Sequence, residues 1–255
     1  MFDLSKYVTI SMTTHILPST NIIEECIASI RDKFIGIDKC KFIIYCDSNK
    51  DNPNHSSYIN SLSNISGVDV VDCLNDGGEI GLKKNYIKGV VDSETPFTFC
   101  CEHDWIFLRE IDLPKLIKTM LEYDFINFVR FNKRDNKYAH INNPEPGDTC
   151  FLETYVQEDS EISDGFQKLM KTNAIATHPH IIRKDKFVKD WLSIAEVSRP
   201  DIAGVVESNL QSAYESDIGT YGIEKAQRLW GIYNYGSSED LKIIKHTDGS
   251  NSGRT

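Results

Sequence analysis

Residues 96–105 have the sequence PFTFCCEHDW, and this stretch decides the predicted fold. The apolar run from Pro96 to Cys101 is typical of a strand that helices cover on both faces, as in a parallel sheet. It leads directly into Glu102, His103 and Asp104. Ligands of such sheets bind beyond the carboxyl ends of the strands, so two carboxylates at this strand end indicate a ligand site.

The chain before this stretch alternates predicted strands with predicted helices. Short apolar, β-branched runs predict strands, and apolar residues at helical spacing predict helices. The expected strands cover Tyr7–Met12, Lys41–Cys46 and Val68–Leu74, and the expected helices cover Asn21–Phe34, Ser56–Leu62 and Glu79–Val91. Repeated strand–helix units predict a parallel sheet with helices on both faces.

The chain after this stretch is less regular. We expect a helix over Leu113–Tyr123, a strand over Phe125–Phe131, a polar loop over Asn132–Asp148, strands near Cys150–Tyr155 and Ala174–Ile182, a helix around Lys184–Ser193 and helical structure over Val205–Gln227. The polar end, 249–255, is expected to be a flexible tail. These elements predict a single α/β domain over residues 1–255, with a central mixed sheet that is parallel in its N-terminal part.

The composition excludes some classes of protein. Of 255 residues, 40% are hydrophobic and 26% are charged, as in an ordinary globular chain. The net charge of -10 argues against non-specific binding of nucleic acid or of anionic membranes. The start of the chain, MFDLSKYVTISMTTH, lacks the pattern of a signal peptide, and no apolar run reaches the roughly 20 residues of a membrane span. The expected location is therefore cytoplasmic.

The seven cysteines do not suggest a disulfide framework. Their number is odd, several lie in apolar runs, and no two are spaced as CxxC. We therefore expect reduced, structural thiols rather than disulfides or a zinc ribbon.

Glu102 and Asp104 form the strongest chemical signal. Two carboxylates spaced two residues apart at a strand end are able to reach one hard divalent cation, which prefers oxygen ligands. Such a cation bridges the phosphates of a nucleotide diphosphate and offsets the charge that develops on this leaving group. The alternative interpretation is a solvated acidic turn.

Four segments, in this order, resemble the family 2 type of GT-A glycosyltransferases: TISMTTH (9–15), FIIYCDSN (42–49), NDGGEIGLKKN (75–85) and FTFCCEHDW (97–105). The resemblance covers roughly residues 7–134 and is looser beyond them. It implies the GT-A fold, a Rossmann-like α/β/α sandwich. It further implies that residues 1–134 bind a nucleotide-sugar and a metal, and that residues 135–248 bind the acceptor.

The resemblance also implies roles for single residues. The nucleobase and ribose pocket would be lined by Thr13, Thr14 and Asp47. The ribose, pyrophosphate and donor sugar would lie near Asp76, Gly81, Lys84 and Asn85. The metal, Mn²⁺ or Mg²⁺, would be held by Glu102 and Asp104, although the family more often has Asp at the first of these positions.

Two later residues complete the implied site. Glu207, in the segment GVVESNL, would be the general base that removes the acceptor proton, although the family usually has Glu-Asp rather than Val-Glu there. Glu215 and Asp217 are rival candidates for the base. His246, in KIIKHTDG, would be a further metal or pyrophosphate ligand, the alternative being an exposed histidine. His178 and His180 are expected to line an acceptor pocket or to pack structurally.

The predicted function is a metal-dependent, inverting transfer of a sugar from a nucleotide-diphosphate sugar, by default a UDP-sugar, to an acceptor hydroxyl. One rival is a sugar-phosphate nucleotidyltransferase, which needs a Gly-rich, basic loop after the first strand. The segment MTTHILPST (12–20) contains neither Gly nor Lys. The other rival is a non-catalytic protein that binds sugars or partners. The absence of Asp104 and Glu207 would favour this rival, but both residues are present.

Overall fold

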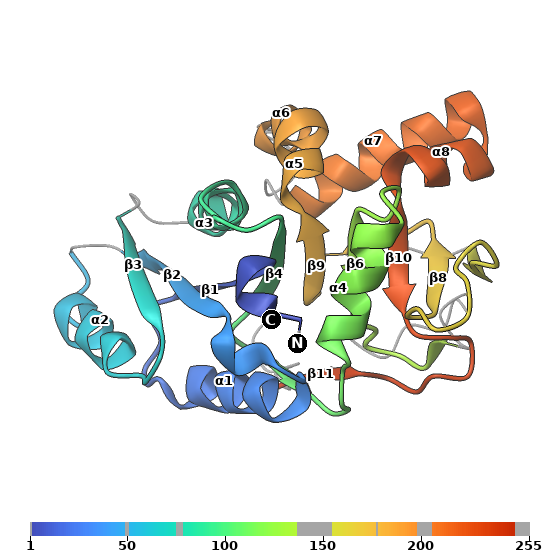
Figure 1. Ribbon diagram of the computed structural model, residues 1–255. Coiled ribbons are helices and arrows are strands. Elements are labelled where there is room, and N and C mark those ends of the chain that lie inside the picture. Colours follow the sequence, from blue (N-terminus) through green and yellow to red (C-terminus); the bar gives the residue numbers. More distant parts are fainter. Residues whose placement is uncertain are drawn as a thin grey trace.

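A nine-stranded mixed sheet forms the centre of the molecule, in the order β3-β2-β1-β4-β9-β6-β10-β8-β7 (Figure 1). The computed structural model describes residues 2–48, 51–74, 79–136, 155–176, 178–197 and 206–247. The strands of this sheet are β1 (Val8–His15), β2 (Lys41–Ser48), β3 (Asp69–Leu74), β4 (Phe97–Glu102), β6 (Phe128–Arg130), β7 (Val156–Glu158), β8 (Leu169–Thr172), β9 (His180–Arg183) and β10 (Ile232–Tyr235).

Strand direction divides the sheet into a parallel part and a mixed part. β1 to β4 are parallel neighbours, β9 is antiparallel to both β4 and β6, and β10 is parallel to β6. β1, β2, β3, β4, β6 and β10 therefore all end at one side of the sheet, which we call the carboxyl edge. β8 and β7 continue the sheet as antiparallel strands. The α/β fold with a mixed sheet, parallel in its N-terminal part, is confirmed.

A second, two-stranded sheet lies at the end of β4. It pairs β5 (Trp105–Phe107) antiparallel with β11 (Ile244–His246), so that His246 is opposite Trp105. This pairing brings a late segment of the chain to the metal motif predicted from residues 102–104.

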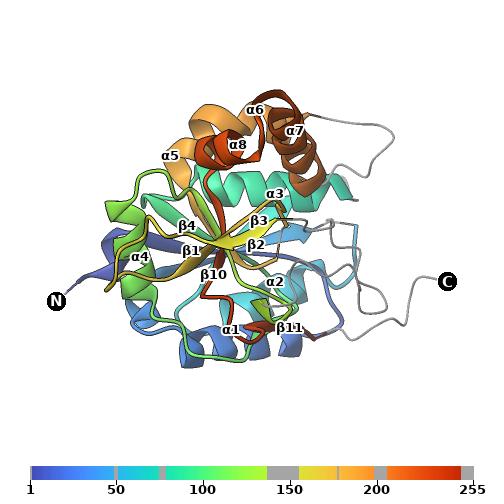
Figure 2. The same ribbon diagram turned by 90° about the vertical axis from the view of Figure 1, so that its right-hand side faces the viewer.

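The helices form two layers, one on each face of the large sheet (Figure 2). One layer contains α1 (Asn21–Lys33), α2 (His55–Ser63) and α4 (Leu113–Glu122). The other contains α3 (Glu79–Val91), α5 (Lys184–Lys186), α6 (Leu192–Glu196), α7 (Val206–Tyr221) and α8 (Ile223–Trp230). A π-helical turn, Phe187–Trp191, joins α5 to α6, and short 3-10 turns cover Leu4–Lys6 and Ile37–Lys39.

Alternate residues of β1 face the two helical layers, because successive side chains of a strand point to opposite faces. Ile10 and Met12 are buried in the core cluster that includes α1 and α4. Ser11 faces α3, where a Cβ atom on Gly89 would lie 2.0 Å from the Ser11 Oγ. Gly89 therefore lets α3 lie directly on β1.

Four phenylalanine rings tie the small sheet to the large one. Phe34, at the end of α1, lies 4.9 Å from Phe99 of β4 and 4.8 Å from Phe107 of β5, centroid to centroid. Phe131, just after β6, packs 5.5 Å from Phe34. Such ring pairs contribute about 0.5–1.5 kcal/mol each beyond the burial of their area.

Several predicted boundaries differ from the structure. β1 continues to His15, beyond the expected end at Met12, because it pairs with β2 as far as Asp47. The expected strand 174–182 is wrong in its first part, since β9 begins only at His180, after Pro179, which has no N–H to donate to a sheet. β8 was not expected at all, and residues 137–154, which contain most of one expected strand, lie outside the described residues, as does the expected tail.

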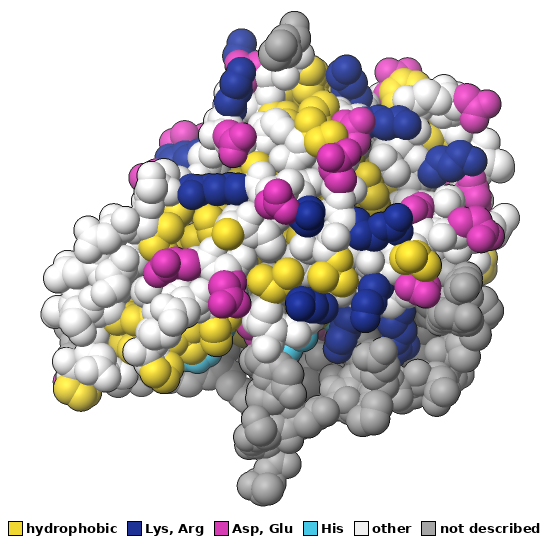
Figure 3. Space-filling view, turned by 90° about the horizontal axis from the view of Figure 1, so that it is seen from below, with side chains coloured by type: hydrophobic (Ala, Val, Ile, Leu, Met, Phe, Trp, Pro, Cys, Tyr) yellow, Lys and Arg dark blue, Asp and Glu magenta, His cyan; other side chains and the backbone are white. Residues whose placement is uncertain are grey.

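On the face seen from below, acidic and basic side chains intermingle with apolar ones over α1 and α4 (Figure 3). Some of these charges pair locally, as Lys33 Nζ does with Asp32 Oδ2 at 2.7 Å. Within the described ranges, no helix is both long and apolar enough to span a bilayer.

Candidate functional site

Several predicted site residues lie at the carboxyl edge, on the side of the sheet that α3 covers. Thr13 of β1 is opposite Glu102 of β4 in the parallel ladder, and His15 is opposite Asp47 of β2. Because directly opposed residues share a face of the sheet, Thr13 and Glu102 both point to the α3 side. Thr13 is buried and Glu102 is half-buried.

The first turns of α3 press against the end of β2. A Cβ atom on Gly81 would lie only 2.0 Å from Asp47 Oδ2, so only a glycine allows this approach. Asn85 follows Gly81 by four residues and so lies on the same, sheet-facing side of the helix. Asn85 is buried, and its Nδ2 has no hydrogen-bond partner among the described residues. Asp47, Gly81 and Asn85 are therefore brought together where α3 meets β2.

Two other predicted donor residues are placed differently, and the structure does not describe a third. Thr14 points to the opposite face from Thr13 and lies near the hydroxyl of Tyr58 on α2. Lys84 is exposed on the side of α3 away from the sheet. Asp76 lies outside the described residues.

Asp104 and His246 form the most constrained pair in the site. His246 Nε2 lies 2.9 Å from Asp104 Oδ2, and Thr247 donates both its N–H and its hydroxyl to the Asp104 carbonyl, at 2.8 and 2.9 Å. The Trp105 ring packs against His246 with centroids 4.6 Å apart, and against His178 at 5.0 Å. β11 thus fixes the late histidine against the carboxylate that ends the metal motif.

The electrostatic environment keeps Asp104 ionised. Burial alone raises the pKa of the Asp104 carboxyl, but the hydrogen bond from His246 and the nearby His103 ring outweigh burial and hold this pKa below its usual value. Its second oxygen, Oδ1, is buried and has no hydrogen-bond partner within the described part of the chain. An ionised carboxylate with an unsatisfied buried oxygen fits a hard cation.

The predicted metal ligands do not all converge in this structure. Across the described ranges, no group of three or more His, Cys, Asp and Glu side chains is arranged to hold a metal ion. Asp104 and His246 are in direct contact, whereas Glu102 lies two residues earlier, at the end of β4 on the α3 side.

Glu207 lies in the first turn of α7 and is half-buried. Its charge contributes to the raised pKa of Tyr86 on α3, although burial of the Tyr86 hydroxyl is the larger cause. The two rival candidates for the base lie further along α7. Glu215 accepts a hydrogen bond from Gln211 Nε2 at 2.8 Å, and Asp217 accepts one from Trp230 Nε1 at 2.7 Å. At 1.5 Å per helical residue, Glu215 lies about 12 Å from Glu207 along the helix axis. Of these three, Glu207 is the one whose charge raises the pKa of Tyr86 on α3.

Tyr86 and His180 are functional candidates that sequence reasoning did not connect. Tyr86 Oη lies 2.8 Å from His180 Nε2, and His180 Nδ1 lies 2.7 Å from the His178 carbonyl. A carbonyl only accepts, so Nδ1 carries the proton, and the Tyr86 hydroxyl donates to Nε2. Burial lowers the pKa of His180 to about 4, so the imidazole is neutral at pH 7. The sole sequence signal was the spacing of His178 and His180 on a predicted strand.

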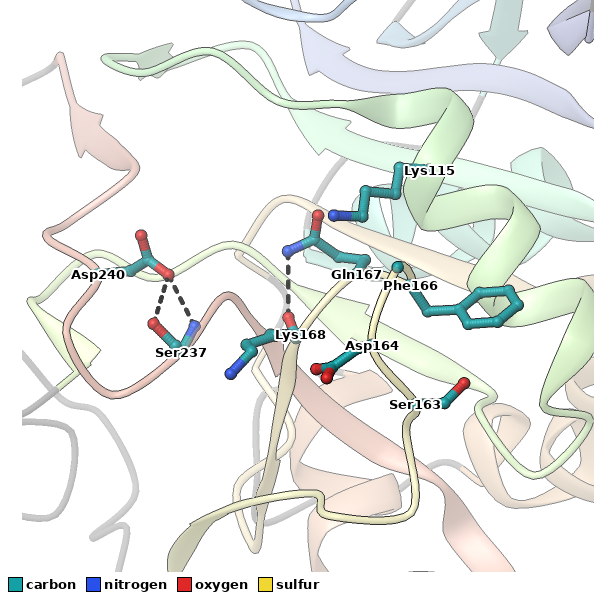
Figure 4. A pocket seen from close by; sticks show the side chains of 9 residues that line it. Lys115, Ser163, Asp164, Phe166, Gln167, Lys168, Ser237 and Asp240 are labelled. Carbon is teal, nitrogen blue, oxygen red and sulfur yellow. Dashed lines mark hydrogen bonds between the residues drawn. The ribbon is translucent and has the colours of Figure 1, made fainter.

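A pocket of about 290 Å³ lies apart from these residues (Figure 4). Its walls come from the start of α4, the segment before β8 and the turn after β10. Asp240 accepts hydrogen bonds from the N–H and the hydroxyl of Ser237, and Gln167 Nε2 donates to the Lys168 carbonyl. The pocket contains none of the residues predicted for the site.

The chain is similar to solved structures of other proteins, at low sequence identity. A scan against protein families and a search of curated proteins gave no match. Among solved structures, the chain is similar to S. aureus TarS 1-349, with 12% identity and a TM-score of 0.49. The match covers 94% of this chain and 60% of that chain. It is also similar to 4-diphosphocytidyl-2C-methyl-D-erythritol synthase from Anaerococcus prevotii DSM 20548, with 11% identity, a TM-score of 0.47 and coverage of 94% of this chain and 93% of that one.

Proposed function

We propose that the protein is a metal-dependent, inverting glycosyltransferase that moves a sugar from a nucleotide-diphosphate sugar, by default a UDP-sugar, to a hydroxyl of an acceptor. Asp104 carries this proposal. Its ionised carboxylate follows β4 at the carboxyl edge, contacts His246 through Oδ2 and leaves Oδ1 buried without a hydrogen-bond partner among the described residues. Leaving this acceptor unsatisfied is costly, and a bound cation would remove the cost.

Asp104 and His246, with Glu102, would hold the cation, either Mn²⁺ or Mg²⁺, since carboxylates with an imidazole suit both ions. When bound, the cation would neutralise the charge of the leaving nucleotide diphosphate. Asp47, Gly81 and Asn85 would bind the nucleoside side of the donor, where α3 meets β2. The buried Nδ2 of Asn85 is a hydrogen-bond donor suited to a ribose or phosphate oxygen.

Glu207 would accept the proton of the acceptor hydroxyl. It stands at the start of α7, on the same side of the sheet as Thr13, Glu102 and α3. A single displacement with a base on the acceptor side inverts the anomeric carbon, and this inference comes from the resemblance to family 2 enzymes.

The test is hydrolysis of a panel of nucleotide-sugars by the purified protein, with Mn²⁺ and with EDTA. We expect release of one nucleotide diphosphate that depends on Mn²⁺ and falls to the EDTA level in Asp104→Asn. Once an acceptor is found, Glu207→Gln should lower the transfer rate by about 10²–10⁴-fold and keep the thermal shift caused by the nucleotide diphosphate with Mn²⁺. Glu215→Gln, on the same helix, is the matched control and should transfer at the wild-type rate.

Equal hydrolysis in Asp104→Asn, or in EDTA, would contradict the metal role of Asp104. Release of pyrophosphate from a nucleoside triphosphate and a sugar phosphate would instead favour the nucleotidyltransferase. If no nucleotide-sugar is hydrolysed and none raises the melting temperature with Mn²⁺ present, the non-catalytic binding protein becomes the better interpretation.

A further inference from the structure

The pocket beside α4 is separate from the residues to which a role has been given so far. It lies between the start of α4, the turn Ser163–Gln167 before β8 and the turn Ser237–Asp240 after β10 (Figure 4). Its volume of about 290 Å³ corresponds to about ten water molecules. Pockets for drug-sized ligands have about 300–1,000 Å³, so this pocket suits a ligand of one or two rings.

Hydrogen bonds to α4 hold the turn before β8 in place. The N–H of Ser163 donates to Tyr123 Oη at 2.9 Å, and the N–H of Gln167 donates to Thr119 Oγ1 at 2.8 Å. Thr119 lies on α4, and Tyr123 directly follows this helix. This wall of the pocket is therefore formed without a ligand, as is usual for binding sites of small molecules.

The turn after β10 is fixed in a similar way. Asp240 Oδ2 accepts hydrogen bonds from the N–H and the hydroxyl of Ser237. The side-chain amide of Asn136 donates to the Ser237 carbonyl at 2.7 Å, and the N–H of Asn136 donates to the Asp240 carbonyl at 2.8 Å. The backbone of this second wall is therefore also held in place by the protein alone.

Three side chains of the pocket keep polar atoms available for a ligand. Among the described residues, neither Lys115 Nζ nor the Asp164 carboxylate has a hydrogen-bond or ion-pair partner. Gln167 Nε2 donates to the Lys168 carbonyl at 3.1 Å, which identifies the other amide atom, Oε1, as an acceptor. Lys115 and Gln167 are half-buried, so their polar ends are close to the protein surface that forms the pocket.

The charges around the pocket balance. Lys115 and Lys168 are cationic, and Asp164 and Asp240 are anionic. A carboxylate or phosphate ligand would meet two like charges, and so would a cation, whereas a neutral ligand meets none. The balance therefore favours an uncharged ligand.

The lining also favours a ligand rich in hydroxyl groups. Phe166 supplies the aromatic part of the lining, but its ring packs edge-on against Tyr123, with centroids 5.4 Å apart. The other lining side chains are polar or charged, apart from a glycine, so an apolar ligand finds little surface to bury. A hydroxyl both donates and accepts, so neighbouring hydroxyls of one sugar ring are able to pair with an ammonium, a carboxylate and an amide oxygen.

We infer that this pocket binds a neutral sugar residue of a glycan, apart from the site of transfer. Asp240 precedes His246 by six residues, so their Cα atoms lie at most about 22 Å apart. A glycan of several sugars would span this distance. Held in the pocket, it would keep its reacting end at a high effective concentration near the candidate site. This role as a tether for the acceptor rests on the proposed function, whereas the binding of a sugar does not.

The test is ligand-observed NMR with glucose, galactose, mannose, N-acetylglucosamine, cellobiose, lactose and chitobiose, with and without UDP and Mn²⁺. We expect at least one saccharide to bind under both conditions. Lys115→Met removes the ammonium and keeps the length of the side chain, and Asp164→Asn removes the charged acceptor. Each should weaken the Kd for that saccharide about tenfold. Lys118→Met, on the same helix but outside the pocket, has the same change of charge and should keep the wild-type Kd.

Several results would overturn the inference. These are no binding of any saccharide, a wild-type Kd in both pocket variants, or displacement of the sugar by UDP with Mn²⁺. Inorganic phosphate or glycine in place of a saccharide, with a Kd that depends on Lys115, would show an anion or zwitterion site instead. Neither altered side chain has a described partner, so both variants should fold. If circular dichroism shows one of them to be unfolded, the other decides.

Donor hydrolysis on the same preparations separates the pocket from the proposed function. Lys115→Met should hydrolyse the donor at the wild-type rate. Saccharide binding that depends on Lys115, in a protein that hydrolyses no nucleotide-sugar, would contradict the proposed function and support the pocket. Hydrolysis without saccharide binding would support the function and overturn the pocket.

The tether has its own measurement once an acceptor is found. Lys115→Met should raise the KM for a glycan of several sugars about tenfold and leave kcat unchanged, because the transfer site is intact. The KM for a monosaccharide acceptor should stay at the wild-type value. An equal change of KM for long and short acceptors would contradict the tether.

Discussion

His180 shows how burial sets the chemistry of a single residue. Its ring stacks on Phe128 with centroids 4.3 Å apart, and both nitrogens are occupied, one by Tyr86 and one by a carbonyl. No room is left for a protonated, solvated imidazolium, so the proton that would charge the ring is bound more readily by the unfolded chain.

The stability of the protein should therefore depend on the protonation of His180. Its pKa is about 4 in the folded protein against 6.5 as the ordinary value, so the unfolded state binds the proton first as pH falls. The free energy of unfolding should decrease from about pH 6.5 to pH 4 by about 3 kcal/mol from this group. Urea titrations of the wild type and of His180→Gln over this range check the prediction. If both lose stability with the same slope, the assignment of the slope to His180 is wrong.

At the residue scale, the sequence singled out several residues that the structure brings together. Gly81 of α3 packs on Asp47, Asn85 lies on the same side of that helix, and His246 contacts Asp104. The contact of Tyr86 on α3 with His180 on β9 was missed, because it depends on how the helix packs on the sheet, which the sequence around either residue does not contain.

At the scale of an element, the residues on one side of helix α3 are explained by the strands on which the helix packs. Gly81, Asn85 and Gly89 recur every four residues and form the side of the helix that rests on β1 and β2. Short side chains there bring the backbone of the helix close to the sheet. The sequence predicted this helix to within its observed bounds, but the reason for its glycines became visible only with the strands beneath it.

A methyl group at Gly89 should destabilise the protein. The Cβ of Gly89→Ala would lie 2.0 Å from Ser11 Oγ, so α3 must move away from β1, at a cost of about 1–3 kcal/mol. Gly219→Ala, in α7 with no heavy atom within 4 Å, should instead stabilise the helix by about 0.5–1 kcal/mol. Chemical denaturation measures both.

The double variant Ser11→Ala with Gly89→Ala tests the cause. Removing Oγ leaves Ser11 Cβ as the nearest remaining atom, at 3.1 Å, so much of the lost stability should return. If the double variant is as unstable as Gly89→Ala alone, the contact with Ser11 is not the reason for the glycine.

Elements were predicted best where they are long. The strands β1 to β4 and the helices α1, α3 and α4 span 6 to 13 residues and carry several repeats of their apolar pattern. β8 and β9 have 4 residues each, too few to show the alternating apolar pattern of a strand. Both are antiparallel to their neighbours, so the alternation of strands and helices that indicates a parallel sheet does not predict them. The second half of the sheet was for this reason predicted only as mixed.

At the scale of the whole molecule, the segment after β10 joins parts that the chain keeps far apart. Ile243 donates to the Asn132 carbonyl, Leu108 donates to the Ile243 carbonyl, and Ile243 and Ile244 are buried in the larger core cluster. The segment therefore closes the core under α1 and α4 and carries His246 to the site at the same time.

Removing residues 237–255 should destabilise the whole fold. The loss of two buried isoleucines costs about 3–6 kcal/mol by area, apart from the lost pairing with β5. Removal of 248–255 alone keeps β11 and all its described contacts, and it should leave the urea midpoint unchanged. Equal midpoints for the two truncated proteins would show that β11 does not support the core.

The pairing of β11 with β5 also orders events during synthesis. A ribosome makes Asp104 about 140 residues before His246, an interval of about 7–28 s at 5–20 residues per second. Throughout that time the nascent chain contains the residues of β1 to β4 and the carboxylates that follow them but lacks the imidazole that contacts Asp104. A growing chain is therefore unable to assemble the Asp104–His246 pair until nearly all of the fold has been made, and a chain halted before residue 246 never does.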